Sequence, residues 1–286
     1  EVLLDRKVDL YHIPQNGIGM PKKKICPFVV TLHDVIPITM PETVGPYYCK
    51  KFLDSIPEIL DKSDAIITVS EFSKVDICRE LGISPSKVFV SRLAAEDIYY
   101  PIDKHMAKAY IKQKYGIEDE FFLYVGGFNP RKNIQTLLMA YALIKEKLKK
   151  NYKVVILGKP GRSYEDLVGL CDELKISDSC IFTGFIPVSD MPWFYNAASV
   201  FVYPSLYEGF GLPVVEAMAC GTPVITSNIT SLPEVVGNGA ITVSPKDYEA
   251  IGDNLLHLVE DNDFYEDMSK KSLDRAAMYS WDKTVK

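Results

Sequence analysis

The sequence predicts an α/β protein made of two doubly wound lobes, each built on a parallel sheet. Short apolar runs alternate with helical segments along the chain, and the alternation breaks between residues 99 and 120 before it starts again. This alternation is typical of parallel sheets, because the chain returns through a helix between neighbouring strands. The 286 residues, 47% of them hydrophobic, are enough for about two domains with separate cores.

The predicted first lobe covers residues 1–98. Its strands are the apolar runs at 8–13, 28–32, 65–69 and 88–90. One helix is expected over 44–60. A second, over 70–81, begins at Ser70, a good N-cap residue, and ends before Gly82, which suits a left-handed C-cap.

Residues 99–120 are the predicted linker, with a charged helical piece at 104–115, and 121–286 form the predicted second lobe. Its strands are expected at 121–125, 154–157, 180–183, 200–203, 223–226 and 240–243. The longest helix is expected over 133–149. Lobes of this kind bind ligands at the carboxyl ends of their strands, here in a cleft between the lobes.

Composition excludes several classes of protein. The net charge of −6 argues against nonspecific nucleic-acid binding, and the lysines of 22–24 and 145–150 are read as solvated faces. The six cysteines form no C-x-x-C pair, the N-terminus lacks signal-peptide form, and no apolar run is long enough to span a membrane. We therefore expect a cytoplasmic protein with reduced thiols; its oligomeric state stays unknown.

Peripheral contact with a membrane remains open. Residues 45–60 mix aromatic, basic and apolar side chains, among them Tyr47, Lys50 and Leu53. Such a helix can lie against a membrane that carries a lipid-linked acceptor, or it can simply face the core.

The most informative stretch is residues 203–226, which follows a strand and leads through a glycine loop into a short helix. Gly209 and Gly211 let the backbone approach a ligand, and Pro213 suits the first turn of a helix whose free N–H groups bind anions. Glu208 and Glu216 flank this loop, and their carboxylates can accept hydrogen bonds from hydroxyls. A phosphate beside hydroxyl-rich rings fits this pattern, as in a nucleotide sugar.

A second glycine loop follows the strand at 121–125. Gly126 and Gly127 are followed by Arg131 and Lys132, directly before the predicted helix. Arg131 can bind a phosphate with two hydrogen bonds and Lys132 can add a compact charge, so a departing diphosphate would be neutralised here. The alternative is a helix start with solvated charges, although cations oppose the dipole at that end.

Polar residues also follow other strands. His33 and Asp34 come after the strand at 28–32. His33 can hydrogen-bond a sugar or be satisfied within its own turn, and Asp34 is read as an Asx-turn or cap residue. Ser70 and Glu71 have an ordinary explanation as helix cap and first-turn acid. In the second lobe, backbone groups of residues 183–187, at the end of a predicted strand, can hydrogen-bond the edge of a nucleotide base.

Metal chemistry and side-chain nucleophiles receive little support. The four histidines are scattered, and the Asp261-Asn262-Asp263 pattern lies in a polar break that reads as a turn. Neither a Gly-x-Ser-x-Gly motif nor a P-loop is present.

Together, the Gly126–Asn133 loop, Thr183-Gly184-Phe185 and the 204–226 stretch resemble the group 1 retaining glycosyltransferases, family GT4, of the GT-B fold. The spacing of Glu208 and Glu216, with seven residues between them, is that family's signature. Within the family, the sequences around Pro130–Asn133, His33–Pro37 and Thr68–Ser73 look most like bacterial mannosyltransferases of polysaccharide assembly.

The resemblance implies a role for each matching residue. It puts Arg131 and Lys132 on the donor diphosphate, Glu216 on the ribose, and Glu208 on the donor sugar with His33 nearby. The implied catalytic residues are thus Glu208, His33, Arg131 and Lys132. The donor-binding residues are Gly126, Gly127, Arg131, Lys132, Phe185, Ile186, Glu208, Gly209, Phe210, Gly211, Leu212 and Glu216.

The implied reaction moves a hexose, of the mannose or glucose type, from a nucleotide-diphosphate sugar to a glycan or lipid-linked acceptor, with retention, without a metal and without a cofactor. Two departures from the family stand out. Gly127 replaces an arginine that many members carry, and the first lobe resembles only part of the family's N-terminal domain. The alternatives left open are a nucleotide-sugar binding module without transfer activity and a sugar-nucleotide epimerase of the same fold.

Overall fold

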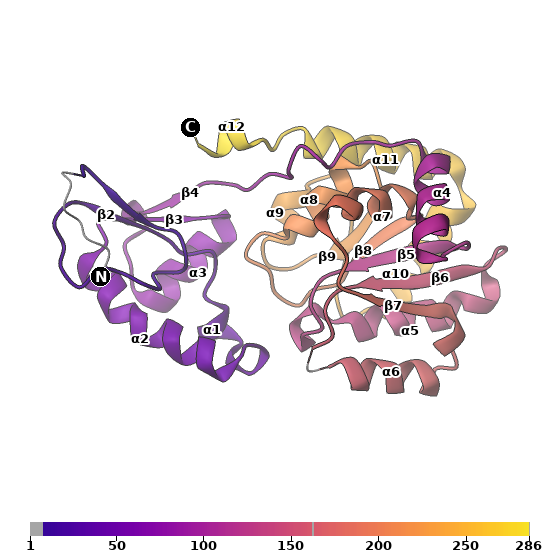
Figure 1. Cartoon of the computed structure of the whole chain (residues 1–286), viewed down its shortest axis with the longest axis horizontal. Helices are drawn as coiled ribbons and strands as arrows, with labels where there is room; N and C mark the ends of the chain where they lie inside the picture. Colours follow the sequence, from indigo (N-terminus) through magenta and orange to yellow (C-terminus); the bar gives the residue numbers. More distant parts are fainter. Residues whose placement is uncertain (1–7, 162, 286) are drawn as a thin grey trace. The chain divides into compact units, whose positions relative to one another are not determined.

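The computed structural model describes residues 8–161 and 163–285. These residues form two units, each built on one parallel sheet, which confirms the predicted α/β class (Figure 1). The first unit holds the residues up to Leu93 together with Glu208–Phe210 and Val285; the second holds Ala94–Tyr207 and Gly211–Thr284. The segment expected as a linker therefore lies within the second unit.

The sheet of the first unit has four strands, paired in the order β1-β2-β3-β4. They are β1 (Tyr11–Ile13), β2 (Phe28–Thr31), β3 (Ala65–Thr68) and β4 (Val88–Val90). All four predicted strands are present, but the first is shorter than the expected 8–13. Only Tyr11–Ile13 pair with β2, and the side chains of Val8 and Leu10 are exposed.

Helices α1 (Ile36–Thr39), α2 (Pro46–Lys62) and α3 (Glu71–Leu81) connect these strands, together with short 3-10 turns at Pro41–Thr43 and Pro85–Lys87. Phe52 and Ile59 of α2 and Ile77 of α3 pack into one core with the strands. The predicted caps of α3 are confirmed: Ser70 Oγ accepts from Ser73 N at 2.9 Å, and Gly82 is left-handed. One face of α2 thus packs into the core, as the core-facing alternative expected, while Tyr47 and Leu53 on the rest of the helix are exposed.

The second unit contains six parallel strands in the order β10-β9-β8-β5-β6-β7. They are β5 (Glu120–Val125), β6 (Tyr152–Leu157), β7 (Cys180–Gly184), β8 (Val200–Tyr203), β9 (Val224–Ser227) and β10 (Ile241–Val243). All six were predicted to within two residues at each end. The order places β5 and β8 in the middle, so the loops that follow them lie side by side.

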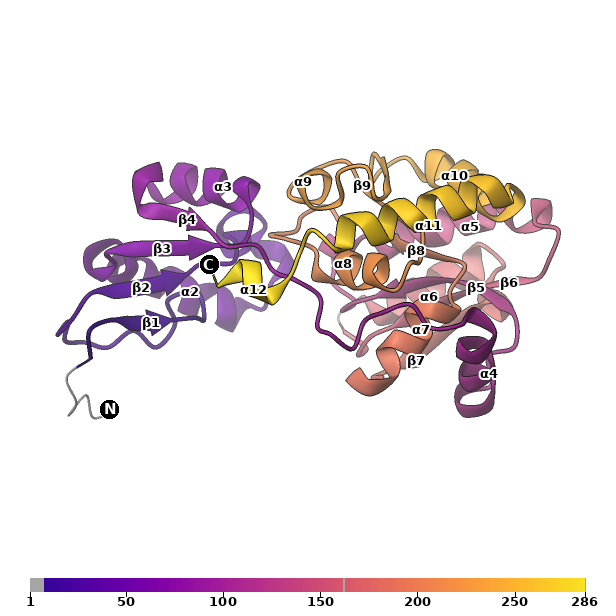
Figure 2. The same ribbon diagram turned by 90° about the horizontal axis from the view of Figure 1, so that it is seen from above.

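Helices cover both faces of this sheet (Figures 1 and 2). On one face α5 (Ile134–Ile144) packs against α6 (Tyr164–Glu173) and α10 (Tyr248–Glu260). On the other, α8 (Leu212–Ala219) packs against α7 (Met191–Ala197), α9 (Leu232–Val236) and α11 (Asn262–Ala276), and α7 against α4 (Lys104–Tyr115). Short 3-10 turns lie at Pro130–Lys132, Lys145–Lys147, Ser177–Ser179 and Val188–Asp190, and α12 (Trp281–Thr284) follows α11.

The expected helix over 133–149 is shorter than predicted, because α5 ends at Ile144 and a 3-10 turn follows. Lysines at 145 and 149 would face each other one turn apart in a longer helix, and such like-charge pairs are unfavourable. The longest described helix of the second unit is instead α11, with 15 residues.

A buried carboxylate fastens α4 to the rest of the second unit. Asp190, at the start of α7, accepts hydrogen bonds from Tyr110 at 2.9 Å and from the Tyr115 hydroxyl, and pairs with Lys114 at 2.7 Å. The Tyr110 ring also stacks on Trp193 with 4.5 Å between centroids. Burial raises the pKa of Asp190, but the hydrogen bonds from Lys114, Tyr115 and Tyr110 outweigh it and lower the pKa to about 2.

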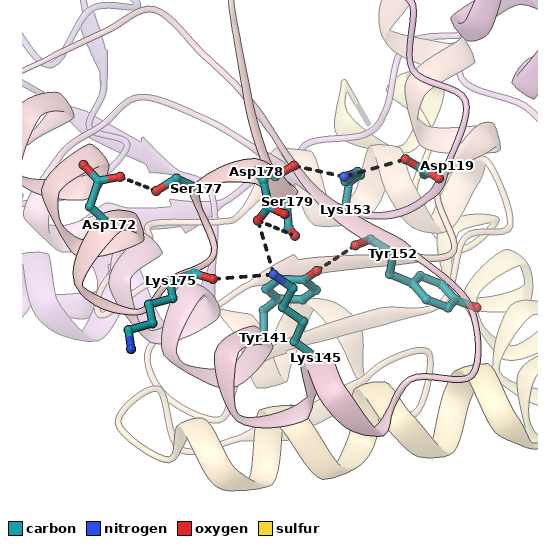
Figure 3. A network of polar contacts seen from close by, with 10 residues as sticks. All are labelled: Asp119, Tyr141, Lys145, Tyr152, Lys153, Asp172, Lys175, Ser177, Asp178 and Ser179. Atoms are coloured by element: carbon teal, nitrogen blue, oxygen red, sulfur yellow. Dashed lines mark hydrogen bonds and ion pairs between the residues drawn. The ribbon is translucent and has the colours of Figure 1, made fainter.

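The amino ends of β6 and β7 are joined by polar side chains (Figure 3). Lys145 donates to Asp178 at 3.2 Å, and Lys153 donates to the Asp178 carbonyl at 2.9 Å. The buried Tyr141 hydroxyl donates to the Tyr152 carbonyl at 2.7 Å. At the amino ends of these strands, the polar side chains therefore bond to other groups of the protein.

All six cysteines are free thiols. None of the helices in the described part of the chain combines the length and the apolar character needed to cross a bilayer.

We predict that Asp190→Asn lowers the free energy of unfolding by about 2 kcal/mol at pH 7, because it removes a buried charge that accepts several hydrogen bonds. The contribution of Asp190 is present above the pKa of about 3.9 of an unfolded aspartate, and is lost as the pH falls through the folded pKa of about 2. Urea unfolding of both proteins between pH 7 and pH 2 measures this.

Asp267→Asn is the matched control, because Asp267 pairs with Lys271 at an exposed site and should change stability by less than about 0.5 kcal/mol. A difference between wild type and Asp190→Asn that does not shrink below pH 4 would contradict the assignment.

Candidate functional site

The loop after β5 is shaped by a tyrosine beneath it. A Cβ atom on Gly126 would lie 2.7 Å from the Tyr124 hydroxyl, and Gly126 has a φ of 153°. The same hydroxyl donates to the Gly127 carbonyl at 3.2 Å. Both predicted glycines of this loop therefore lie at the carboxyl end of β5, and Gly126 has no room for a side chain.

Arg131 and Lys132 lie in the 3-10 turn that follows, and they contact residues 203–207 at the end of β8 and just after it. The Arg131 guanidinium donates to the Tyr207 carbonyl, and Leu206 N donates to the Arg131 carbonyl at 2.8 Å. The Lys132 ammonium donates to the Tyr203 hydroxyl and lies 4.9 Å from the centroid of that ring. The structure thus brings together two segments that the sequence singled out separately.

Asn133 connects this turn to two further loops. Its side chain is buried, and Nδ2 donates to the carbonyls of Pro204 at 2.9 Å and Pro245 at 2.6 Å. Its backbone is left-handed, with φ 56°, a conformation that asparagine adopts more readily than most residues. The cationic turn is therefore held from both sides.

Gly158 is a residue that the sequence reasoning missed. It follows β6, and a Cβ atom there would lie 1.9 Å from the Gly126 carbonyl oxygen. The Gly158 N–H also donates to the Gly184 carbonyl at 3.1 Å. The available signal was the position of Gly158 directly after a predicted strand, the same placement as Gly126 and Gly184.

The helix of the 203–226 stretch begins as predicted. Gly211 is the left-handed residue before α8, and a Cβ atom there would lie 2.6 Å from the Leu232 side chain. Pro213 lies in the first turn, one residue after Leu212. The first N–H groups of α8 thus follow the glycine loop, which is the arrangement expected of an anion-binding helix start.

Glu216 lies in the middle of α8, in the second unit. Its Oε2 accepts from the Tyr195 hydroxyl at 2.7 Å. Burial raises the pKa of Glu216, although hydrogen bonds from Tyr195 and Tyr99 act in the opposite direction. Neither tyrosine was singled out from the sequence, because both are distant from Glu216 along the chain.

Glu208, Gly209 and Phe210 belong to the first unit, where Glu208 and Phe210 are buried. The Gly209 carbonyl accepts from Ser70 Oγ at 2.7 Å and from Ser73 Oγ at 3.0 Å. A Cβ atom on Gly209 would lie 2.7 Å from the His33 carbonyl oxygen. Glu208 is therefore in the same unit as His33, close to the residues that follow β2 and β3.

The side chains of His33 and Asp34 differ in their hydrogen bonds. Asp34 Oδ1 accepts from Ile36 N at 3.1 Å, which confirms the Asx-turn. The His33 backbone donates to Asn16 Oδ1 at 2.8 Å, but its imidazole makes no hydrogen bond within the described residues. Neither a bond of this ring within its own turn nor its contact with a sugar is seen in the described residues, and both stay predictions.

Phe185 and Ile186, the two residues predicted to lie beside the base, follow β7 and differ in solvent exposure. The Phe185 side chain is 76% exposed, whereas Ile186 is buried. Gly184 is left-handed, with φ 73°, and turns the chain between β7 and these residues. An exposed aromatic ring at a carboxyl strand end is suited to stacking on a planar ring.

Asp261 acts as a helix cap, as its turn-like sequence predicted. Its Oδ1 accepts from Phe264 N at 2.9 Å at the start of α11. Within residues 8–161 and 163–285, no three histidine, cysteine, aspartate or glutamate side chains are grouped to hold a metal ion.

We predict that Gly158→Ala weakens the binding of a nucleoside diphosphate by tenfold or more, because the new Cβ displaces the Gly126 backbone; a misplacement of about 1 Å can cost on the order of 100-fold in function. Calorimetric titration with GDP and UDP measures the loss.

Gly169→Ala is the control, because a Cβ on Gly169, within α6, meets nothing within 4 Å. This change should leave affinity unaltered and stabilise the helix by up to about 1 kcal/mol. Unchanged affinity in Gly158→Ala would show that the loop tolerates the side chain.

The sequence matches two family descriptions, one in each half. Residues 1–91 match "Glycosyltransferase Family 4", and residues 108–275 match "Glycosyl transferases group 1". O-antigen chain mannosyltransferase B of Escherichia coli is 35% identical over 281 residues, which cover 98% of this chain and 73% of that protein. Serotype-specific mannosyltransferase WbdA of E. coli is 32% identical over 282 residues, but this chain spans only 34% of its length.

Solved structures share the fold at low sequence identity. Sucrose-phosphate synthase from Thermosynechococcus elongatus aligns with a TM-score of 0.79 and 24% identity, over 96% of this chain and 71% of that one. WaaG, a glycosyltransferase involved in lipopolysaccharide biosynthesis, aligns with a TM-score of 0.75 and 16% identity, over 90% and 72%. HepE from Anabaena, in complex with UDP and glucose, aligns with a TM-score of 0.76 and 18% identity, over 91% of this chain and 68% of that one.

The solved structures confirm the predicted GT-B fold. The family match and the mannosyltransferase relatives confirm the predicted enzyme class, a hexosyltransferase. Because both halves match and a relative of which the match covers 73% is 35% identical, this chain belongs to the group 1 glycosyltransferases of the GT4 type.

Proposed function

We propose that this chain transfers mannose from a nucleotide-diphosphate sugar to a hydroxyl of a glycan or lipid-linked acceptor, with retention and without a metal or cofactor. The observation that carries the proposal is the cationic turn of Arg131 and Lys132, held at the carboxyl edge of the second sheet against residues 203–207. The names of the relatives favour mannose; GDP-mannose and UDP-glucose are the two donor types to be separated.

In the proposed reaction, the bond between the sugar C1 and the diphosphate oxygen breaks while C1 bonds to the acceptor oxygen. The acceptor proton passes to an oxygen of the leaving diphosphate on the same face of the sugar. Arg131, Lys132 and the start of α8 stabilise the charge that develops on the diphosphate, a role otherwise filled by a metal ion. No side-chain nucleophile is required, and the configuration at C1 is kept.

The remaining predicted residues hold the donor. Glu208 orients the sugar, with His33 nearby in the same unit, and Glu216 accepts hydrogen bonds from the ribose hydroxyls. Backbone groups of Gly209–Leu212 meet the phosphate and sugar, and those of Phe185 and Ile186 meet the base. A relative such as WbdA is about three times as long as this chain, so what the whole relative acts on does not identify the acceptor of this chain. The acceptor is therefore proposed together with the reaction.

Incubation with GDP-mannose, UDP-glucose or ADP-glucose and a short mannose oligosaccharide tests the proposal. We expect one donor to be consumed, an α-anomeric product by NMR from an α-linked donor, and the same rate with EDTA present. Binding without transfer would instead indicate a nucleotide-sugar binding module, and a changed donor sugar without transfer an epimerase. An inverted product or loss of activity in EDTA would overturn the mechanism.

The same assay separates the two glutamates. Glu208→Ala should lower turnover, and Glu216→Ala should mainly weaken donor binding, each by about 10- to 100-fold. Each substitution removes a charged carboxylate that accepts hydrogen bonds from the donor in the proposed site. Unchanged kinetics in both variants would overturn the assignment of the pair.

We also propose that the protein works in the cytoplasm, against the inner face of a membrane, through the exposed side of α2. Tyr47 is 81% exposed on this helix, Leu53 is exposed as well, and Lys50 and Lys51 lie between them. Aromatic and basic side chains on one helix suit an anionic lipid surface.

Sedimentation with vesicles of phosphatidylglycerol or phosphatidylcholine tests this surface. Binding should require phosphatidylglycerol and fall about tenfold or more in Lys50→Glu/Lys51→Glu, at roughly 1 kcal/mol per lysine removed near the surface. Lys147→Glu/Lys150→Glu makes the same charge change in the second unit and should bind like wild type. Equal loss in both variants would refute the placement on α2.

A further inference from the structure

Two tyrosines from different parts of the second unit converge on the Glu216 carboxylate. Tyr195, on α7, donates its hydroxyl to Glu216 Oε2 at 2.7 Å. Tyr99, from the segment before α4, lies beside this carboxylate, and its hydroxyl acts to lower the pKa of Glu216. The two rings meet edge to face, with 5.7 Å between centroids. Glu216 is therefore held from two directions by groups that do not belong to its own helix.

The surroundings fix Tyr195 firmly. Its side chain is fully buried, and its ring meets Phe201 of β8 edge to face at 5.4 Å. Its carbonyl accepts from Thr222 Oγ1 at 2.6 Å. Tyr99, in contrast, lines a cavity of about 520 Å³ together with Glu96 and Ala219, so one side of it borders open space.

No cation balances Glu216 within the described residues. Its titratable neighbours are Tyr195 on α7, Tyr99 and Glu96 in the segment before α4, and Cys220 at the end of α8. Burial raises the pKa of Glu216 and the charge of Glu96 adds to this, while only the two phenols favour the ionised form. A buried carboxylate without a cation depends on its hydrogen bonds to stay charged.

A carboxylate has about four acceptor positions, and two phenols fill only two of them. The remaining positions can accept two neighbouring hydroxyls. A purely structural pairing of buried tyrosines would need only an acceptor, which a backbone carbonyl supplies elsewhere in this unit for Tyr141.

We propose that Tyr195 and Tyr99 are positioning residues, which hold the Glu216 carboxylate ionised and in one orientation so that it accepts the 2′- and 3′-hydroxyls of the donor ribose. This inference rests on the proposed function, in which Glu216 contacts the ribose. The phenols themselves touch neither the sugar nor the phosphates.

The test is calorimetric titration of wild type and Tyr195→Phe with GDP or UDP, whichever binds tighter, and with its 2′,3′-dideoxy analogue, between pH 5 and pH 8. Wild type should discriminate against the dideoxy analogue, and Tyr195→Phe should reduce that discrimination about tenfold. Loss of one phenol also raises the pKa of Glu216 further, so the pH below which binding weakens should move upward.

Tyr141→Phe is the matched control, because it removes an equally buried hydroxyl from α5, on the opposite face of the sheet from α7 and α8; Figure 3 shows Tyr141. It should lower stability without changing discrimination or the pH profile. Tyr99→Phe provides a second variant with less effect on packing, and the same shift in discrimination is expected there.

Two failures can be told apart. If wild type binds the ribose and dideoxy forms equally, and Glu216→Gln binds like wild type, the ribose contact itself is wrong and the inference falls with it. If wild type discriminates but both tyrosine variants keep its discrimination and pH profile, the ribose contact stands and the positioning role is overturned.

Discussion

The second unit depends on the buried side chain of Asn133. Its amide reaches the carbonyls of Pro204 and Pro245, and its left-handed backbone ends the turn that carries Arg131 and Lys132. Without this amide, two buried carbonyls would lose their donor, which is costly in a protein interior. Asn133 thus adds to the contacts of Arg131 and Lys132 that keep the cationic turn against residues 203–207.

The amino ends and the carboxyl ends of the strands in the second sheet make different kinds of contact. At the amino edge, side chains such as Lys145, Lys153 and Tyr141 bond to Asp178 and to the Tyr152 carbonyl, so polar groups satisfy one another. At the carboxyl edge, glycines bring backbone against backbone and leave N–H groups at the start of α8. The first arrangement stabilises the sheet, and the second is suited to a ligand that brings its own charge.

Two carboxylates of this unit receive similar donors with opposite results. Asp190 is met by two phenols and Lys114, and its pKa falls to about 2. Glu216 is met by two phenols and by the like charge of Glu96, and its pKa rises. Burial is the largest cause of the raised pKa of Glu216, whereas at Asp190 the hydrogen bonds from Lys114, Tyr115 and Tyr110 together outweigh the effect of burial. Asp190 is thus a structural anchor between α4 and α7.

The strands, the caps at Ser70 and Asp261 and the two glycine loops could be predicted from the sequence, because buried parallel strands are continuously apolar and caps are local. The prediction overestimated the helix after Asn133, where repulsion among lysines acts against continuation. The approach of Gly158 to Gly126 and the hydrogen bond from Tyr195 to Glu216 could not be predicted in this way. Such contacts follow from the order of the strands in the sheet and from side-chain packing across it, and a pattern read along the chain contains neither.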